Sequence, residues 1–148
     1  YLGERDLADE ADVAAIVSDT RIESIFDLTD AMGRGDRSTA LTLLDRLLAE
    51  GQAPLMILAM MTRHFRQMWK ISELVSQKVP QSELPRRVGA SPYFLKGLMQ
   101  QATRFDHRQY RQVFNRFLET DLALKSSGGE PRIQLEQLLL EIADMSRK

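Results

Sequence analysis

Apolar residues recur at helical spacing along almost the whole chain, and the alternation typical of half-buried strands is absent. Asp36 can cap a helix whose apolar face spans residues 40–48 and which ends at Gly51, and Pro54 begins a long helix that reaches about Val75. Further helices are predicted over Ala11–Val17 and Ile22–Met32, in one short stretch of the turn-rich segment 79–92, from Ser91-Pro92 to about Thr103, from about Asp106 to Lys125, and from Pro131 onward.

This pattern of about eight helices and no strand predicts an all-α protein. Residues 1–20 are acidic and alanine-rich, and they read as the end of a preceding unit. Residues 21–148 are expected to form a compact bundle of about six or seven helices. The chain begins with Tyr1 rather than Met, so we expect it to be an internal piece of a longer protein.

Three charged residues fall inside the apolar arcs of the last two predicted helices. On a helix with about 100° per residue, Asp121 lies near the middle of such an arc, and Lys125 lies close enough to pair with it across one turn. That arc contains Tyr110, Val113, Phe114, Phe117, Leu118 and Leu124. We predict that Lys125 bridges Asp121 and Glu136, and so fixes how the last two helices dock. The alternative, which the sequence leaves open, is that all three are ordinary, partly exposed charges.

The last helix, which begins at Pro131, is apolar over far more than half of its circumference. A helix with so wide an apolar arc is buried on more than one side. The second buried side is therefore expected to meet a partner.

The long helix from Pro54 divides into an apolar side and a basic stripe formed by Arg63, Arg66 and Lys70. The stripe suits an acidic partner or phosphate groups, although a solvated face is the more frequent meaning of such a pattern. His64 falls on the apolar side and is interpreted as a core histidine.

Net charge, cysteine content and the length of apolar runs limit the classes of function that this chain can have. The net charge is −1, which does not support binding of nucleic acid by bulk charge alone. The absence of cysteine excludes disulfides, thiolate metal sites and a cysteine nucleophile, and fits a reducing cytoplasm. No apolar run approaches the roughly 20 residues of a transmembrane helix.

No arrangement of residues argues for catalysis, a metal or a cofactor. His64 and His107 have no metal-binding companion three or four residues away, and Ser126 and Ser127 have no nearby histidine to activate them. The segment Lys-Ser-Ser-Gly-Gly lacks the order of a phosphate-binding loop and follows no strand. Its glycines, Gly128-Gly129, are better explained as a break between two helices.

Two stretches, residues 26–71 and 118–142, resemble the carboxy-terminal part of the delta subunit of the bacterial DNA polymerase III clamp loader. Each short motif is weak alone, but their order and spacing together are fairly specific. The matching positions are Phe26, Leu28, Asp30, Ala31, Gly35, Asp36, Ala40, Leu41, Gly51, Pro54, Arg63, Phe65, Arg66, Asp121, Lys125, Leu135 and Glu136.

The resemblance implies that residues 1–20 end a small helical lid domain and that residues 21–148 form a helical collar domain. The collar would join delta to the gamma/tau and delta-prime subunits. A missing amino-terminal part would open the sliding clamp, which the complex loads on primer–template DNA in the bacterial cytoplasm. This region would carry no enzymatic activity of its own.

Two other readings compete with the collar. A tetratricopeptide-like adaptor is suggested by the small-residue rhythm of residues 31–54, but no second copy follows at a spacing of about 34 residues. A nucleic-acid binder would use the basic stripe together with Arg86, Arg87, Arg104 and Arg108.

Overall fold

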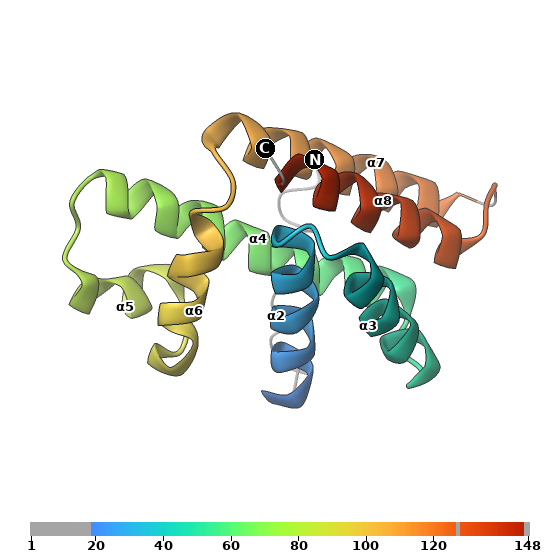
Figure 1. Cartoon of the computed structure of the whole chain (residues 1–148), viewed down its shortest axis with the longest axis horizontal. Coiled ribbons are helices and arrows are strands. Elements are labelled where there is room, and N and C mark those ends of the chain that lie inside the picture. The colour runs from blue at the N-terminus through green and yellow to red at the C-terminus, as the bar shows by residue number, and fades with distance from the viewer. Residues whose placement is uncertain (1–18, 127, 147–148) are drawn as a thin grey trace.

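The computed structural model of the chain describes residues 19–126 and 128–146. Within these ranges the chain forms seven α-helices, one turn of 3-10 helix and no strand (Figure 1). The elements are α2 (Asp19–Gly33), α3 (Arg37–Ala49), α4 (Pro54–Ser76), η1 (Gln81–Glu83), α5 (Leu84–Val88), α6 (Pro92–Ala102), α7 (His107–Lys125) and α8 (Pro131–Ser146). The predicted all-α fold is confirmed. The helix predicted over 11–17 lies outside the described residues.

The helix boundaries follow from local capping chemistry, which is why the sequence predicts them closely. Asp36 caps α3 by accepting a hydrogen bond from the Thr39 amide at 3.2 Å. Asp106 and Gln109 form a capping box at the start of α7, with reciprocal side-chain to backbone bonds of 2.8 and 2.9 Å. Gly51 follows α3 with a φ of +89°, a left-handed conformation that suits glycine.

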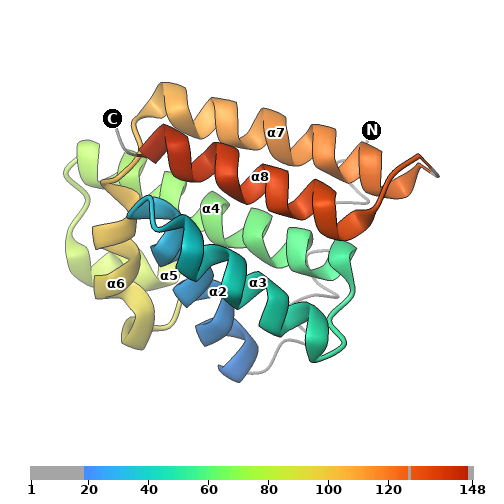
Figure 2. The ribbon, with the colours of Figure 1, turned by 45° about the vertical axis from the view of Figure 1, so that its right-hand side comes forward.

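α4 is the longest helix and the centre of the bundle. It contacts α2, α5, α6, α7 and α8. In Figures 1 and 2, α7 and α8 lie side by side along one edge, while α2, α3 and α6 extend away from that edge. No helix in the described ranges combines the length and apolarity needed to cross a membrane.

The wide apolar arc of α8 is covered by the chain itself. α8 packs against α7 on one side and against α2, α3 and α4 on others. Its buried residues are Leu135, Leu138, Leu139, Ile142 and Ala143. The expectation that the second apolar side of α8 meets a partner is therefore wrong, because helices of the same chain cover that side, while the outer side of α8, with Gln137, Glu141 and Asp144, is exposed.

The junction of α2 with α6 depends on one close approach and one partly buried ion pair. A Cβ added to Gly97 would lie 2.4 Å from Cζ of Phe26, so only glycine admits that ring without a shift. Arg104 donates to the Asp30 carboxylate at 2.7 Å. Burial alone would raise the pKa of Asp30, but hydrogen bonds from Arg104 and Arg34 outweigh burial and lower it. Arg104 thus contributes to the packing of the fold.

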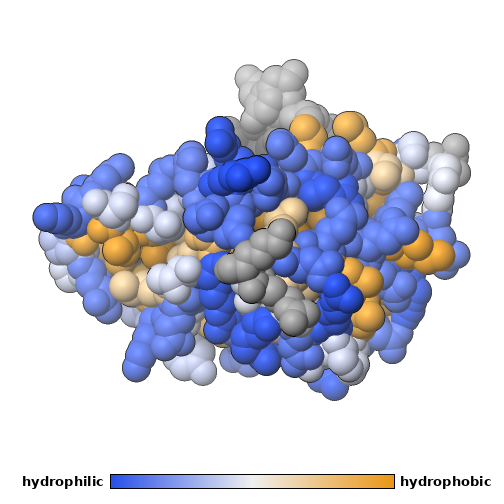
Figure 3. Space-filling view, turned by 45° about the horizontal axis from the view of Figure 1, so that its top comes forward, coloured by the Kyte–Doolittle hydropathy of each residue, from blue (hydrophilic) through white to orange (hydrophobic). Residues whose placement is uncertain are grey.

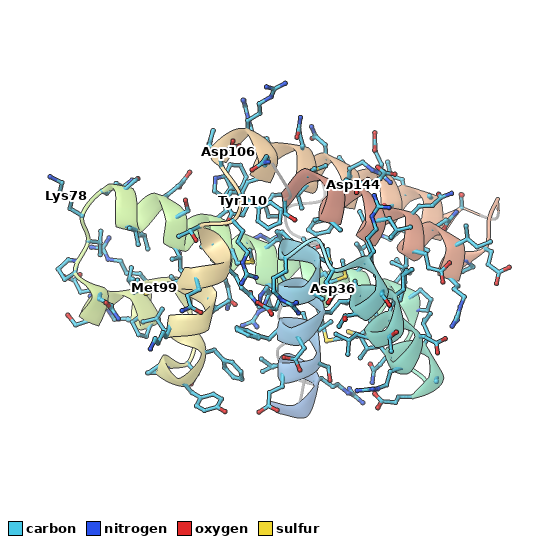
Figure 4. The ribbon with its side chains drawn as sticks, viewed as in Figure 1. Asp36, Lys78, Met99, Asp106, Tyr110 and Asp144 are labelled. Carbon is cyan, nitrogen blue, oxygen red and sulfur yellow. The ribbon has the colours of Figure 1, made fainter. Side chains whose placement is uncertain are left out.

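Aromatic side chains join α4 to α7. Trp69 stacks on Tyr110 and Phe114, with ring centroids 5.6 and 5.4 Å apart. The Tyr110 hydroxyl donates to the carbonyl of Ala102 at 2.7 Å, near the turn into α7 (Figure 4). Burial raises the pKa of Tyr110, which keeps the hydroxyl a donor. This cluster sets the antiparallel docking of the two helices.

Candidate functional site

The ion pair predicted at the end of α7 is present. Lys125 Nζ lies 3.0 Å from Asp121 Oδ2, one helical turn away. The two side chains are 40% and 28% exposed, so water screens their attraction. A pair of this kind stabilises a helix by about 0.3–0.5 kcal/mol. Asp121 and Lys125 are therefore partly exposed rather than buried charges.

Glu136 does not join that pair in the described structure. Its ion pair is with Arg132, one turn earlier in α8, at 3.9 Å. Arg132 also donates from Nη1 to Asp45 of α3 at 3.0 Å. Glu136 therefore belongs to a charge cluster between α8 and α3, and a bridge from Lys125 to Glu136 would need side-chain rearrangement.

The polar contacts that connect α7 with α8 come from residues that the sequence did not single out. Arg116 makes two hydrogen bonds to the Glu141 carboxylate, of 2.6 and 3.1 Å, and these bonds raise the Arg116 pKa. Gln109 donates to the Met145 carbonyl at 2.9 Å. The sequence carries no signal for these contacts, because the paired residues lie 25 and 36 positions apart.

The three residues of the predicted basic stripe lie on α4, but their surroundings differ. Arg66 and Lys70 are exposed, whereas Arg63 is half-buried and lines a groove beside α2. Arg63 and Arg66 both have interaction partners. The use of this stripe by an acidic partner stays a prediction.

His64 is a core histidine, as predicted, and is 7% exposed. Its Nε2 lies 2.6 Å from Oε1 of Gln101 in α6, and Gln101 in turn donates to the Phe26 carbonyl of α2 at 3.1 Å. Burial lowers the pKa of His64 to about 4; the Gln101 hydrogen bond opposes this shift, and the charge of Arg63 adds to it. The imidazole is therefore neutral at pH 7 and links three helices. Gln101 was missed, although a glutamine on the apolar side of α6 is a usable signal.

The groove beside His64 has a volume of about 300 Å³ and lies between α2, α4, α6 and the segment that joins α5 to α6. Its lining consists of Ile22, Glu23, Phe26, Arg63, His64, Gln67, Gly89, Ala90, Ser91, Tyr93, Phe94 and Leu98. Tyr93 is 79% exposed and its ring packs edge-on against Phe94. Among the described residues, no three His, Asp or Glu side chains converge as metal ligands.

The outer face of α7 carries apolar side chains that the rest of the described chain does not bury. Leu118 and Leu122 are 47% and 58% exposed. Figure 3, seen from above α7 and α8, shows apolar groups in separate patches on a mainly hydrophilic surface. Leu118 belongs to the predicted apolar arc of this helix but lies at its edge, and the neighbouring helices cover the opposite edge, which leaves Leu118 half-exposed.

Comparison with known proteins gives concordant results. A family model described as "DNA polymerase III delta subunit, C-terminal domain" matches residues 22–142. The DNA polymerase III subunit delta of Bacillus subtilis is 22% identical over 148 residues, which cover all of this chain and 43% of that protein.

Among solved structures, the Bacillus subtilis DNA clamp loader delta protein has a similar fold. The TM-score is 0.78 at 22% identity, over 90% of this chain and 40% of that chain. The chain thus spans less than half the length of the relatives it matches.

Proposed function

The chain belongs to the family of carboxy-terminal domains of DNA polymerase III delta subunits, and on this premise we propose that it is the assembly domain of a clamp-loader delta subunit. The observation that carries the proposal is the family match over residues 22–142, to which the shared fold adds support. A tetratricopeptide-like adaptor is not favoured by these matches.

The proposed domain organisation places the end of a lid domain in residues 1–20 and the collar in residues 21–148. The start of the family match at residue 22 supports this division. Helix α2 begins at Asp19, so the boundary falls at the first turn of a helix. Residues 1–18 lie outside the described structure.

The proposed partners are the gamma/tau and delta-prime subunits, which the collar would hold beside delta. Contacts with the sliding clamp would come from parts of the subunit beyond this chain, and contacts with primer–template DNA would occur in the complete complex. The domain would act in the bacterial cytoplasm by keeping the delta subunit attached to its neighbours, without catalysing a reaction. The family's role in replication supports this assignment.

Two sets of residues have proposed roles in this assembly. Asp121 and Lys125 would stabilise the carboxyl end of α7 through their ion pair. Glu136 would help to hold α8 against α3 through Arg132, which donates to Asp45. The stripe of Arg63, Arg66 and Lys70 would meet acidic groups of a neighbouring subunit.

The test is reconstitution of the full subunit that contains this chain with the other clamp-loader subunits, followed by native mass spectrometry. The proposal predicts one stable complex that contains the subunit. A folded subunit that stays alone at micromolar concentration in the presence of the other subunits contradicts the proposal.

A further inference from the structure

The exposed face of α7 has the spacing of a coiled-coil seam. Six residues, spaced alternately three and four positions apart, are all solvent-exposed. They are Arg108, Arg111, Asn115, Leu118, Leu122 and Lys125, which together we call the α7 seam. From end to end the seam extends over about 26 Å at 1.5 Å per residue. This face is long enough to receive several turns of a second helix.

The α7 seam is basic at its amino end and apolar towards its carboxyl end, and this difference determines which partner fits it. Leu118 and Leu122 are half-exposed leucines at its centre and towards its carboxyl end. At its amino end, Arg108 and Arg111 are exposed, and neither forms an ion pair within the described residues. Asn115 lies between the two groups, and a polar residue at such a position is a device that fixes the register of paired helices.

From this pattern, and resting on the proposed function, we propose that the α7 seam is the docking surface for one amphipathic helix of a neighbouring clamp-loader subunit. That helix presents apolar side chains to Leu118 and Leu122 and carboxylates to Arg108 and Arg111. The two leucines provide apolar contact area, while the two arginines fix the direction and register of the incoming helix.

The composition of the seam argues against the other occupants. The seam contains three cations and no carboxylate. A second copy of this chain would bring only the flanking Asp121 and Glu119, which already pair with Lys125 and Arg116, so it matches Arg108 and Arg111 less well than a helix with carboxylates of its own. Nucleic acid would gain little from the two leucines, because its backbone presents phosphates rather than apolar groups. An acidic, apolar helix satisfies both halves of the seam.

The experiment uses the full subunit that contains this chain, mixed with the gamma/tau and delta-prime subunits, and measures affinity by analytical ultracentrifugation. Leu118→Asp combined with Leu122→Asp removes the apolar half, and Arg108→Glu combined with Arg111→Glu reverses the charged half. Val75→Asp is the matched control, because Val75 is 48% exposed and lies outside the seam. Circular dichroism melts establish whether each variant is folded. If the variant with Leu118→Asp and Leu122→Asp does not fold, the variant with Leu118→Ala and Leu122→Ala takes its place.

Each seam variant is expected to weaken association by about tenfold or more, as for central contact residues, with no change for Val75→Asp. The arginine variant should also weaken the salt dependence of binding. Seam variants that assemble like wild type overturn the inference while the proposed function stands. A wild-type subunit that does not assemble refutes the proposed function, and the inference with it.

Two further results would also overturn the inference. Self-association of the wild-type subunit that the leucine variant abolishes would show a second copy on the seam. Loss of DNA binding in the arginine variant, with assembly intact in both variants, would show a nucleic-acid surface.

Discussion

His64 makes the stability of this domain depend on pH in a predictable way. The buried imidazole has a pKa of about 4 in the folded chain, against an ordinary value of 6.5. Between these values the unfolded chain binds a proton that the folded chain does not, so stability rises with pH across this window. The stability is complete above about pH 6.5 and is lost progressively as the pH falls towards 4.

The size of the effect follows from the two pKa values. At pH 5 the unfolded chain is mostly protonated at His64 and the folded chain is not. This difference in proton binding lowers the unfolding free energy by about 2 kcal/mol relative to pH 7. A typical domain has an unfolding free energy of roughly 5–15 kcal/mol, so this loss is a substantial part of it. It should therefore be measurable by urea denaturation at the two pH values.

The variant that tests this prediction is His64→Gln, because glutamine can still donate to Gln101 but does not titrate. It is expected to lose about 2 kcal/mol less than wild type between pH 7 and pH 5, whatever its stability at pH 7. The carboxylates are unchanged, so their contribution cancels in this comparison. His107→Gln is the matched control, since His107 is the second histidine and is exposed. Equal losses in wild type and His64→Gln would show that His64 is not the group responsible.

Three further predictions concern stability, each measured as the change in unfolding free energy by urea denaturation. Asp36→Ala removes the cap of α3 and should lower the unfolding free energy by about 1 kcal/mol. Asp36→Asn keeps a capping oxygen and should retain most of that stability. Gly97→Ala places a methyl group 2.4 Å from the Phe26 ring and should cost about 1–3 kcal/mol; Phe26→Leu in the same chain should recover part of this loss. Glu141→Gln weakens the pair between α7 and α8 and should cost about 1 kcal/mol, whereas Lys125→Met should cost less than about 0.5 kcal/mol.

Each of these predictions has a specific contrary result. An Asp36→Asn variant as unstable as Asp36→Ala would show that the hydrogen bond to the amide is not the cause. Additive losses in the Gly97→Ala, Phe26→Leu double variant would show that the two residues do not compete for space. A larger loss for Lys125→Met than for Glu141→Gln would show that the ion pair at the end of α7 has the greater role in docking.

The helices were predictable from the sequence because their signals are local. Asp36 lies next to the helix it caps, and periodic apolar positions define a face without knowledge of what covers it. The interpretation of His64 as a core residue succeeded for the same reason. The clamp-loader resemblance likewise depended on the order of short motifs, which is visible in one sequence.

The cross-helix contacts were not predictable, because they depend on how helices dock. Arg116 and Glu141 are each unremarkable surface residues until α7 and α8 pack side by side. Helical phase placed Leu118 in the apolar arc of α7, but phase alone does not show which part of an arc the neighbouring helices cover. The wide apolar arc of α8 correctly predicted that this helix is buried on several sides. The sequence could not show that the helices that cover it, α2, α3, α4 and α7, belong to the same chain.

The proposed role of this domain is to attach a delta subunit to its clamp loader. The most direct test is native mass spectrometry of the reconstituted loader, with the full subunit either intact or lacking residues 22–142, the range that matches the family. The intact subunit is expected to enter the complex, and the deleted subunit, with the rest of it still folded, is expected to stay outside. Entry of the deleted subunit with undiminished affinity would show that the attachment lies elsewhere in the protein.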